Sequence, residues 1–182
     1  MGAIVITKQA AAQRLILSAV KMFERSDDPL AIHVVASSAL NLLRELTQAR
    51  GPNFTTLSVR EGIFRAALSR AKGKPEPFLG SAEELDGVID QIVQLIQSGA
   101  VKSAEDLEIS GGEIDERKYL DKIIRPFNFL KHAQRDPLTT LDEGDVDPFD
   151  ALTHAIGAFY FLFPGEQLQE EVIDFLRARQ FI

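Results

Sequence analysis

The sequence predicts an all-α fold, a single-domain helical bundle of about six to seven helices that spans residues 1–182. Three observations lead to this prediction. Apolar residues recur at intervals of three and four almost throughout, and the alternation typical of β-strands is nearly absent. Capping residues, in two places followed by proline, precede the apolar stretches, and glycine or proline follows most of them. The connections between the stretches are short, which is typical of a bundle.

Four helices are expected in the first half of the chain. Thr7 can cap the first helix. Asp28 and Pro29 start the second with a capping carboxylate and a proline at the first helical position. Ser81 and Glu84 have the spacing of a capping box, which starts the fourth. The expected ranges are about 7–24, 29–50, 55–72 and 81–99.

Three more helices are expected in the second half, after a loop at 100–112 with a short helical turn. The fifth covers about 113–133, and Pro126 should kink it or cost it a hydrogen bond. An acidic loop at 136–146 follows, and Asp147 and Pro148 then start a sixth helix that reaches Phe163. That helix is apolar on most of its circumference, so we expect it at the centre of the bundle. A last amphipathic helix ends near Arg179.

Composition excludes several classes of protein. The net charge of −7 argues against broad binding to nucleic acid or to membrane surfaces. The absence of cysteine excludes disulfides, thiolate metal sites and cysteine nucleophiles. No apolar run is long enough for a membrane span or a signal peptide, so we expect a cytoplasmic protein without membrane contact. No phosphate-binding or dinucleotide-binding glycine motif occurs, and we expect no cofactor.

One stretch carries the strongest functional signal. Arg125, Asn128, His132 and Asp136 follow one another at spacings of three, four and four, so they would project from one stripe of a helix. An acid/base group beside a cation and two hydrogen-bonding groups suits an active site. The solvent side of an ordinary amphipathic helix would show the same spacing. However, Asn, His and Asp are poor helix formers, and Pro126 adds a local inconsistency of the kind found at functional sites.

The other two histidines have simpler interpretations. His33 lies at the edge of the core arc of its helix, with Ser37 four residues later. It is either a half-buried histidine bonded to a neighbour or a member of a site shared with His132. His154 lies one turn after Asp150, and a structural hydrogen bond between them explains it. No pair of histidines has the spacing of metal ligands, so we expect no metal site.

The segment from Arg125 to His132 resembles the Arg-x4–6-His motif of HEPN domains, a superfamily of small all-α bundles that includes metal-independent ribonucleases. In that family two motif helices face each other across a dimer, and two arginines and two histidines form a composite cleft. The resemblance implies that His132 is the acid/base group and that Arg125 holds the phosphate. The residue after the arginine is usually polar in the family and is Pro126 here.

A second resemblance covers most of the chain. The stretch Asn-Phe-Leu-Lys-His-Ala-Gln-Arg-Asp-Pro at 128–137, together with Asp-Pro-Leu-Ala-Ile-His at 28–33, is similar to a group of uncharacterised bacterial proteins with Asn-Phe-Phe-Lys-His-Ala-x-Arg-Asp-Pro. This resemblance implies no activity.

Two function hypotheses follow. The first is a HEPN-like, metal-independent endoribonuclease or toxin-type RNA-processing protein. It acts as a homodimer, with Arg125 and His132 as catalytic residues and with Asn128, Asp136 and His33 as binding residues. The second is a non-catalytic bundle that binds a protein partner or a nucleotide through the same stripe. A metal-dependent enzyme that uses the histidines is the least favoured alternative.

Overall fold

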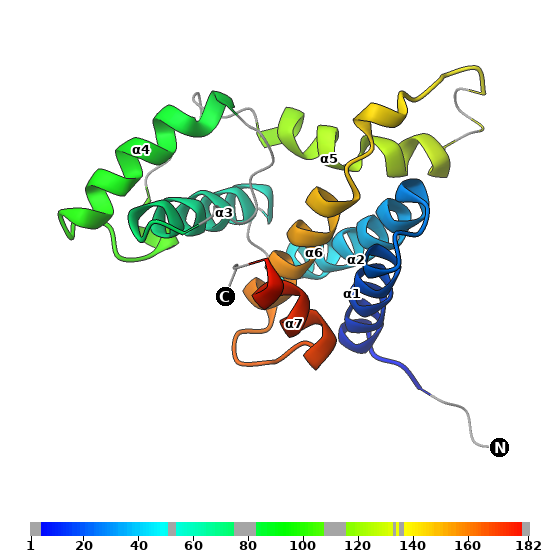
Figure 1. Ribbon diagram of the computed structural model, residues 1–182, viewed down its shortest axis with the longest axis horizontal. Helices are drawn as coiled ribbons and strands as arrows, with labels where there is room; N and C mark the ends of the chain where they lie inside the picture. Colours follow the sequence, from blue (N-terminus) through cyan, green and yellow to red (C-terminus); the bar gives the residue numbers. More distant parts are fainter. Residues whose placement is uncertain are drawn as a thin grey trace.

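The computed structural model describes residues 5–50, 54–74, 83–107, 116–132, 134 and 137–179. Within these residues the fold is all-α, with seven α-helices and no strand, which confirms the predicted fold class. Two short 3-10 helices, η1 (Ala104–Asp106) and η2 (Glu143–Asp145), lie in the connections. The α-helices, shown in Figure 1, are α1 (Lys8–Glu24), α2 (Pro29–Ala49), α3 (Phe54–Ala71), α4 (Glu83–Gln97), α5 (Glu116–Lys131), α6 (Pro148–Leu162) and α7 (Glu170–Ala178).

Capping side chains set the starts of three helices where the sequence predicted them. The Thr7 hydroxyl accepts a hydrogen bond from the Ala10 N–H at 3.0 Å at the start of α1. Asp28 and Asp147 cap α2 and α6, each followed by proline at the first helical position. The capping box expected at Ser81 lies outside the described residues. Local side-chain chemistry therefore accounts for these boundaries.

The main core is built around α6. Eight of its residues are buried, and α6 contacts α1, α2, α3 and α5, with the most extensive contact to α2. This confirms the central position predicted from its apolar circumference. Three aromatic rings, Phe23 of α1, Phe149 of α6 and Phe175 of α7, lie within 5.7–6.3 Å of one another, centroid to centroid. These contacts join the first and last helices to the centre of the core.

A second, smaller core lies between α3 and α4. Its buried residues are Ile63, Ala66 and Ala67 of α3, Ile89 and Ile92 of α4, and Val101 and Leu107 of the segment after α4. Arg70 strengthens the hairpin through ion pairs with Asp86 at 2.7 Å and Asp90 at 2.6 Å. The hairpin projects to one side of the molecule, and α3 connects it to the rest through contacts with α2, α5 and α6 (Figure 1).

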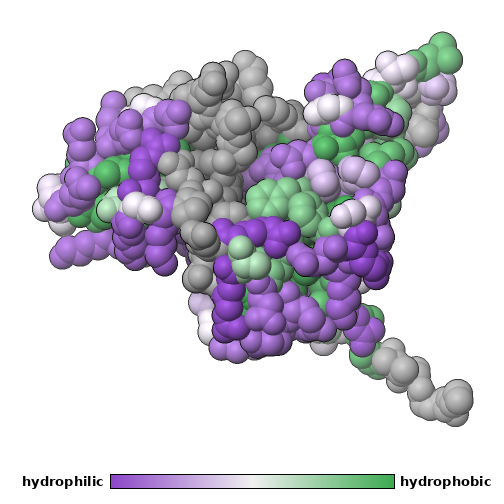
Figure 2. Space-filling view, viewed as in Figure 1, coloured by the Kyte–Doolittle hydropathy of each residue, from purple (hydrophilic) through white to green (hydrophobic). Residues whose placement is uncertain are grey.

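Helix α5 lies across the upper side of the molecule in Figure 1 and contacts α2, α3 and α6. It continues through Pro126, whose side chain is buried, and Ile123 joins the main core. Leu130, near the end of this helix, is 41% exposed. The loop that joins α5 to α6 extends outward, and an apolar group stands at its tip, where Leu138 is 90% exposed (Figure 2).

Candidate functional site

The predicted stripe lies on a face of α5 that is partly open to solvent. The Arg125 side chain is 61% exposed, and Asn128 and His132 are partly exposed. The main-chain N–H of His132 donates to the main-chain oxygen of Asn128 at 3.0 Å, so helical hydrogen bonding continues to the end of the stripe. Three of the four residues therefore share one face, while Asp136 lies outside the described residues.

Arg125 forms an ion pair with a residue that sequence reasoning had not connected to it. Its Nη1 lies 3.2 Å from Oδ2 of Asp145, which belongs to η2. Both side chains are largely exposed, so the pair contributes only about 0–1 kcal/mol. The contact nevertheless keeps the guanidinium beside the acidic loop. A stronger anion, such as a phosphate, would compete for the same donor groups.

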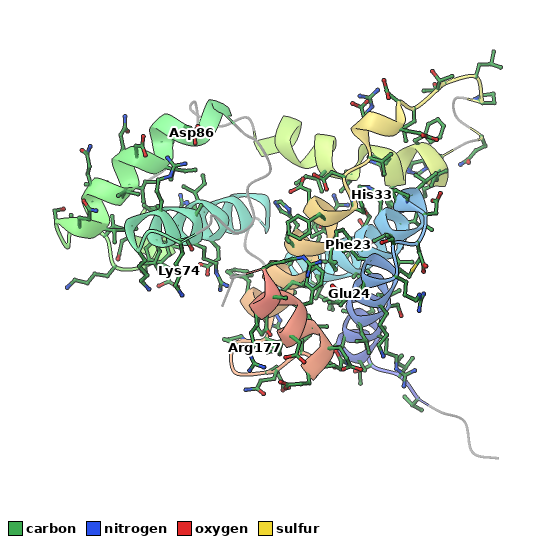
Figure 3. All side chains as sticks on the ribbon, in the orientation of Figure 1. Phe23, Glu24, His33, Lys74, Asp86 and Arg177 are labelled. Atoms are coloured by element: carbon green, nitrogen blue, oxygen red, sulfur yellow. The ribbon has the colours of Figure 1, made fainter. Side chains whose placement is uncertain are left out.

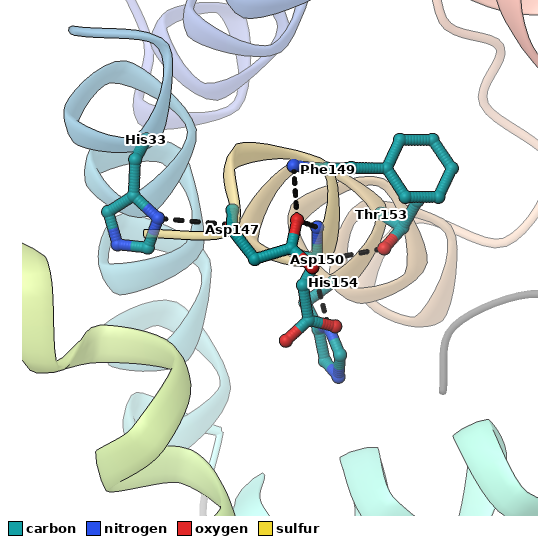
Figure 4. Close-up of polar contacts among 6 residues, drawn as sticks. All are labelled: His33, Asp147, Phe149, Asp150, Thr153 and His154. Atoms are coloured by element: carbon teal, nitrogen blue, oxygen red, sulfur yellow. Dashed lines mark hydrogen bonds and ion pairs between the residues drawn. The ribbon is translucent and has the colours of Figure 1, made fainter. Parts of the chain in front are cut away.

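His33 is buried, with only 1% of its surface exposed, where the sequence had indicated a half-buried residue at most. Its Nδ1 lies 3.2 Å from the main-chain oxygen of Asp147 (Figure 4). A carbonyl oxygen only accepts, so Nδ1 must carry a proton and Nε2 of the neutral ring carries a lone pair. Within the described part of the chain, Nε2 has no hydrogen-bond partner. Burial lowers the pKa of His33, against the opposing effect of the Asp147 main-chain oxygen and of the Asp147 and Asp150 charges.

Asp147 makes two kinds of contact at the start of α6, one through its side chain and one through its main chain. Its Oδ1 accepts hydrogen bonds from the N–H groups of Phe149 at 2.9 Å and Asp150 at 3.0 Å. Its main-chain oxygen accepts from His33 of α2. His33 therefore lies at a joint between α2 and the start of α6, as Figure 3 and Figure 4 show, and it is not part of the α5 stripe.

His154 forms the hydrogen bond that the sequence predicted. Its Nδ1 lies 2.8 Å from the main-chain oxygen of Asp150 and 3.1 Å from Oδ1 of the same residue. Burial lowers the pKa of His154, but the hydrogen bonds and the charge of Asp150 outweigh it and raise the pKa overall. The interaction stabilises the first turns of α6.

The described part of the acidic loop before α6 contains a short turn at η2. Asp142 Oδ1 accepts from the Gly144 N–H at 2.9 Å, which closes the turn at η2. Across the described residues, no three His, Cys, Asp or Glu side chains lie close enough together to hold a metal ion. None of the helices described is both long and apolar enough to cross a membrane.

A groove of about 500 Å³ lies on another part of the molecule, between α1 and α7. Val20, Phe175 and Ala178 form its apolar floor. Ion pairs cross it, because Lys21 lies 3.1 Å from Glu171, and Glu24 lies 3.2 Å from Arg179. Since its charged side chains already pair with one another, the groove resembles a helix–helix contact more than a ligand site.

When the chain is compared with known protein families, with curated proteins and with solved structures, none of them matches it.

Proposed function

We propose that this protein is a metal-independent endoribonuclease and that Arg125 of α5 and His132, directly after it, act together on one phosphodiester. The supporting observation is that helical hydrogen bonding continues from Arg125, which is exposed, to His132, which is partly exposed, so a spacing of seven residues puts them on one face. At about 1.5 Å of rise per residue their Cα atoms are roughly 10 Å apart along the axis. A long guanidinium side chain and an imidazole can flank one phosphate across that span.

The chemistry requires a proton acceptor, a proton donor and a positive charge. His132 would take the proton of a ribose 2′-OH, the resulting oxygen would attack the adjacent phosphorus, and the 5′-oxygen would leave with a proton. The products are a 2′,3′-cyclic phosphate and a 5′-hydroxyl. Arg125 would stabilise the negative charge that develops on the phosphoryl oxygens, and Asn128, between the two on the stripe, would donate a hydrogen bond. In a homodimer, His132 of the partner subunit would supply the proton to the leaving oxygen.

Asp145 has a place in this proposal as a competitor of the substrate. Its ion pair with Arg125 is exposed and therefore weak. A phosphate that accepts two hydrogen bonds from a guanidinium binds it more strongly than a single carboxylate oxygen does. The negative charge of the η2 loop would also disfavour non-specific binding of RNA along this face. Substrates would then be recognised at the stripe and not by overall charge.

The test is RNA cleavage in the presence of a metal chelator. We expect His132→Ala and Arg125→Ala to lose activity by about 10²–10⁴-fold, the usual contribution of a positioned acid/base group. Lys131→Ala is the matched control, because it removes a neighbouring exposed cation of α5 that is not on the stripe, and we expect it to retain activity. Equal cleavage by all four proteins, or none by the wild type, would contradict the proposal.

A second candidate function is recognition of a protein partner through the same face. The observation that favours it is that two large apolar side chains, Leu130 of α5 and Leu138 of the loop after it, are exposed, and apolar surface left open to solvent is what a protein partner would cover. This candidate predicts that the wild type leaves RNA intact and that RNA added to it shifts no NMR signal of Arg125 or His132. Cleavage, or shifts confined to those residues, would contradict it.

A further inference from the structure

The joint between α2 and α6 depends on a buried imidazole in one protonation state. The His33 ring is 1% exposed, and its Nδ1–H donates to the main-chain oxygen of Asp147. On the side of the ring away from Asp147, Nε2 is buried, and the described residues offer it no hydrogen-bond partner (Figure 4). The neutral ring leaves only a lone pair unsatisfied there. A protonated ring would bury a charged N–H with no acceptor, which is a far larger cost.

We propose that the contact between His33 and Asp147 is a proton-controlled latch. It holds the start of α6 against α2 while the ring is neutral, and it releases this end of α6, with the adjoining η2, when the ring takes up a proton. The inference goes beyond the proposed function and does not depend on it, because its consequence is a movement of the chain.

The neighbouring charges decide whether a protonated ring is tolerated in place. The elements that adjoin α2 carry several titratable or charged side chains: Asp28 at the start of α2, Glu24 and Arg25 at the end of α1, Arg125 of α5 and His132 just after it, Asp145 of η2, and Asp147 and Asp150 at the start of α6. Of these, only Asp147 and Asp150 favour the charged ring, and burial acts against it more strongly. Arg125 pairs with Asp145, Arg25 with Asp27 and Glu24 with Arg179.

His154 keeps the first turns of α6 intact, so that only the contact between α2 and α6 opens. Protonation strengthens its interaction with Asp150, which lies within the first turns of α6. Mild acid therefore puts a buried charge into the contact between α2 and α6, which disfavours that contact, while it strengthens the N-terminal turns of α6 itself. We expect α6 to stay helical while Asp147, with the adjoining η2, moves away from α2. Because Asp145 belongs to η2, release also removes this carboxylate from Arg125.

The experiment measures amide hydrogen exchange by NMR from about pH 7.5 to about pH 5.5, a range that spans the ordinary titration of imidazole. The reporters are the amides of Asp145 and Val146, which donate within η2, and rates are corrected for intrinsic exchange. In the wild type we expect their protection to fall by up to about tenfold per pH unit below the ordinary pKa of histidine. Amides in the middle of α6 should keep theirs.

Two variants make the test specific. His33→Asn retains a donor close to the position of Nδ1 but cannot take up a proton, so we expect its protection at η2 to be independent of pH. His154→Gln removes the histidine of α6 and should behave like the wild type at η2. The same pH dependence in His33→Asn and the wild type, or no dependence in the wild type, would overturn the proposal.

A direct titration covers the case in which His33→Asn does not fold. The NMR signal of the His33 ring in the wild type should titrate below the ordinary range, together with the amides of Asp145 and Val146. A ring that titrates in the ordinary range, or that titrates while these amides stay unchanged, would overturn the proposal.

Discussion

At the scale of single residues, two histidines near the start of α6 have opposite environments. His33 donates from Nδ1 to an uncharged main-chain oxygen and is otherwise enclosed, so burial lowers its pKa. His154 is also largely enclosed, and burial alone would lower its pKa, but its partner is the carboxylate of Asp150, which raises it. The charge of the hydrogen-bond partner therefore decides which protonation state the fold prefers.

These shifts predict opposite dependences of stability on pH. The lowered pKa of His33 means that its contribution is present above the unfolded value of 6.5 and is lost as pH falls through the folded pKa. The raised pKa of His154 means that its contribution is present below 6.5 and is lost as pH rises through the folded pKa. Urea unfolding across this range should therefore show that His154→Gln is most destabilised, relative to the wild type, in mild acid. A constant difference between the two at every pH would contradict the assignment.

The pair between Arg125 and Asp145 gives a second prediction at this scale. Asp145→Asn should change the free energy of unfolding by no more than about 1 kcal/mol, because exposed pairs contribute little. It should raise RNA cleavage by about two- to fivefold, because the substrate phosphate no longer competes with Asp145 for Arg125, and a pair of up to about 1 kcal/mol corresponds to that factor in rate. Cleavage rates with and without chelator check this, and Asp142→Asn serves as a matched loss of charge in the same loop. Equal increases in both variants would assign the effect to overall charge.

At the scale of elements, the N-terminus of α6 has the most demanding attachment in the fold. Asp147 caps the helix with its side chain and binds α2 with its main chain. Since a substitution changes only the side chain, the two roles separate by mutation. The cap belongs to the side chain, and the contact with His33 survives any replacement that keeps the backbone in place.

Asp147→Ala should therefore cost about 1 kcal/mol, the usual loss for an N-cap, and Asp147→Asn should cost much less. Asp28→Ala provides the matched control, because Asp28 caps α2 through a single bond to the Ala31 N–H at 3.0 Å. The measurement is the urea midpoint at constant slope. A loss well above that of Asp28→Ala would mean that the Asp147 side chain also orients the main-chain contact with His33.

Helix positions were predictable from the sequence because caps, proline and apolar spacing act locally. Thr7, Asp28 and Asp147 all cap helices where the sequence placed them. The side of α5 that packs was less predictable, since Pro126 is buried and Leu130 is exposed. That outcome depends on where α5 crosses its neighbours, which no local pattern records. The burial of His33 likewise depends on a tertiary contact, because the N-terminus of α6 packs against it.

At the scale of the whole molecule, the buried residues that the structure describes form two hydrophobic clusters. One is centred on α6, and the other lies between α3 and α4. The sequence indicated one bundle, because apolar spacing shows that a helix has a packing face and does not show which helix covers it. The same limit applies to the candidate site. Helical spacing predicted that Arg125, Asn128 and His132 share a face, but the approach of Asp145 to Arg125 is a tertiary contact.

Two core substitutions of similar size should have different consequences. Ile156→Ala in α6 and Ile89→Ala in α4 both remove fully enclosed side chains, at a cost of about 2–5 kcal/mol to the cluster concerned. Ile89→Ala should speed hydrogen exchange in α3 and α4 while α1, α2 and α6 keep their protection. Ile156→Ala should lower protection throughout the main core. Equal loss in all helices of both variants would mean that the two clusters unfold as one unit.

The central claim is that Arg125 and His132 act on one phosphodiester, and the most direct measurement is the mass of the RNA fragments formed in the presence of chelator. We predict fragments that end in a 2′,3′-cyclic phosphate and carry a 5′-hydroxyl. Their amount should fall at least about a hundredfold in His132→Ala while the unfolding transition stays unchanged. Fragments with 5′-phosphate ends, or equal amounts from the wild type and a folded His132→Ala, would contradict the claim.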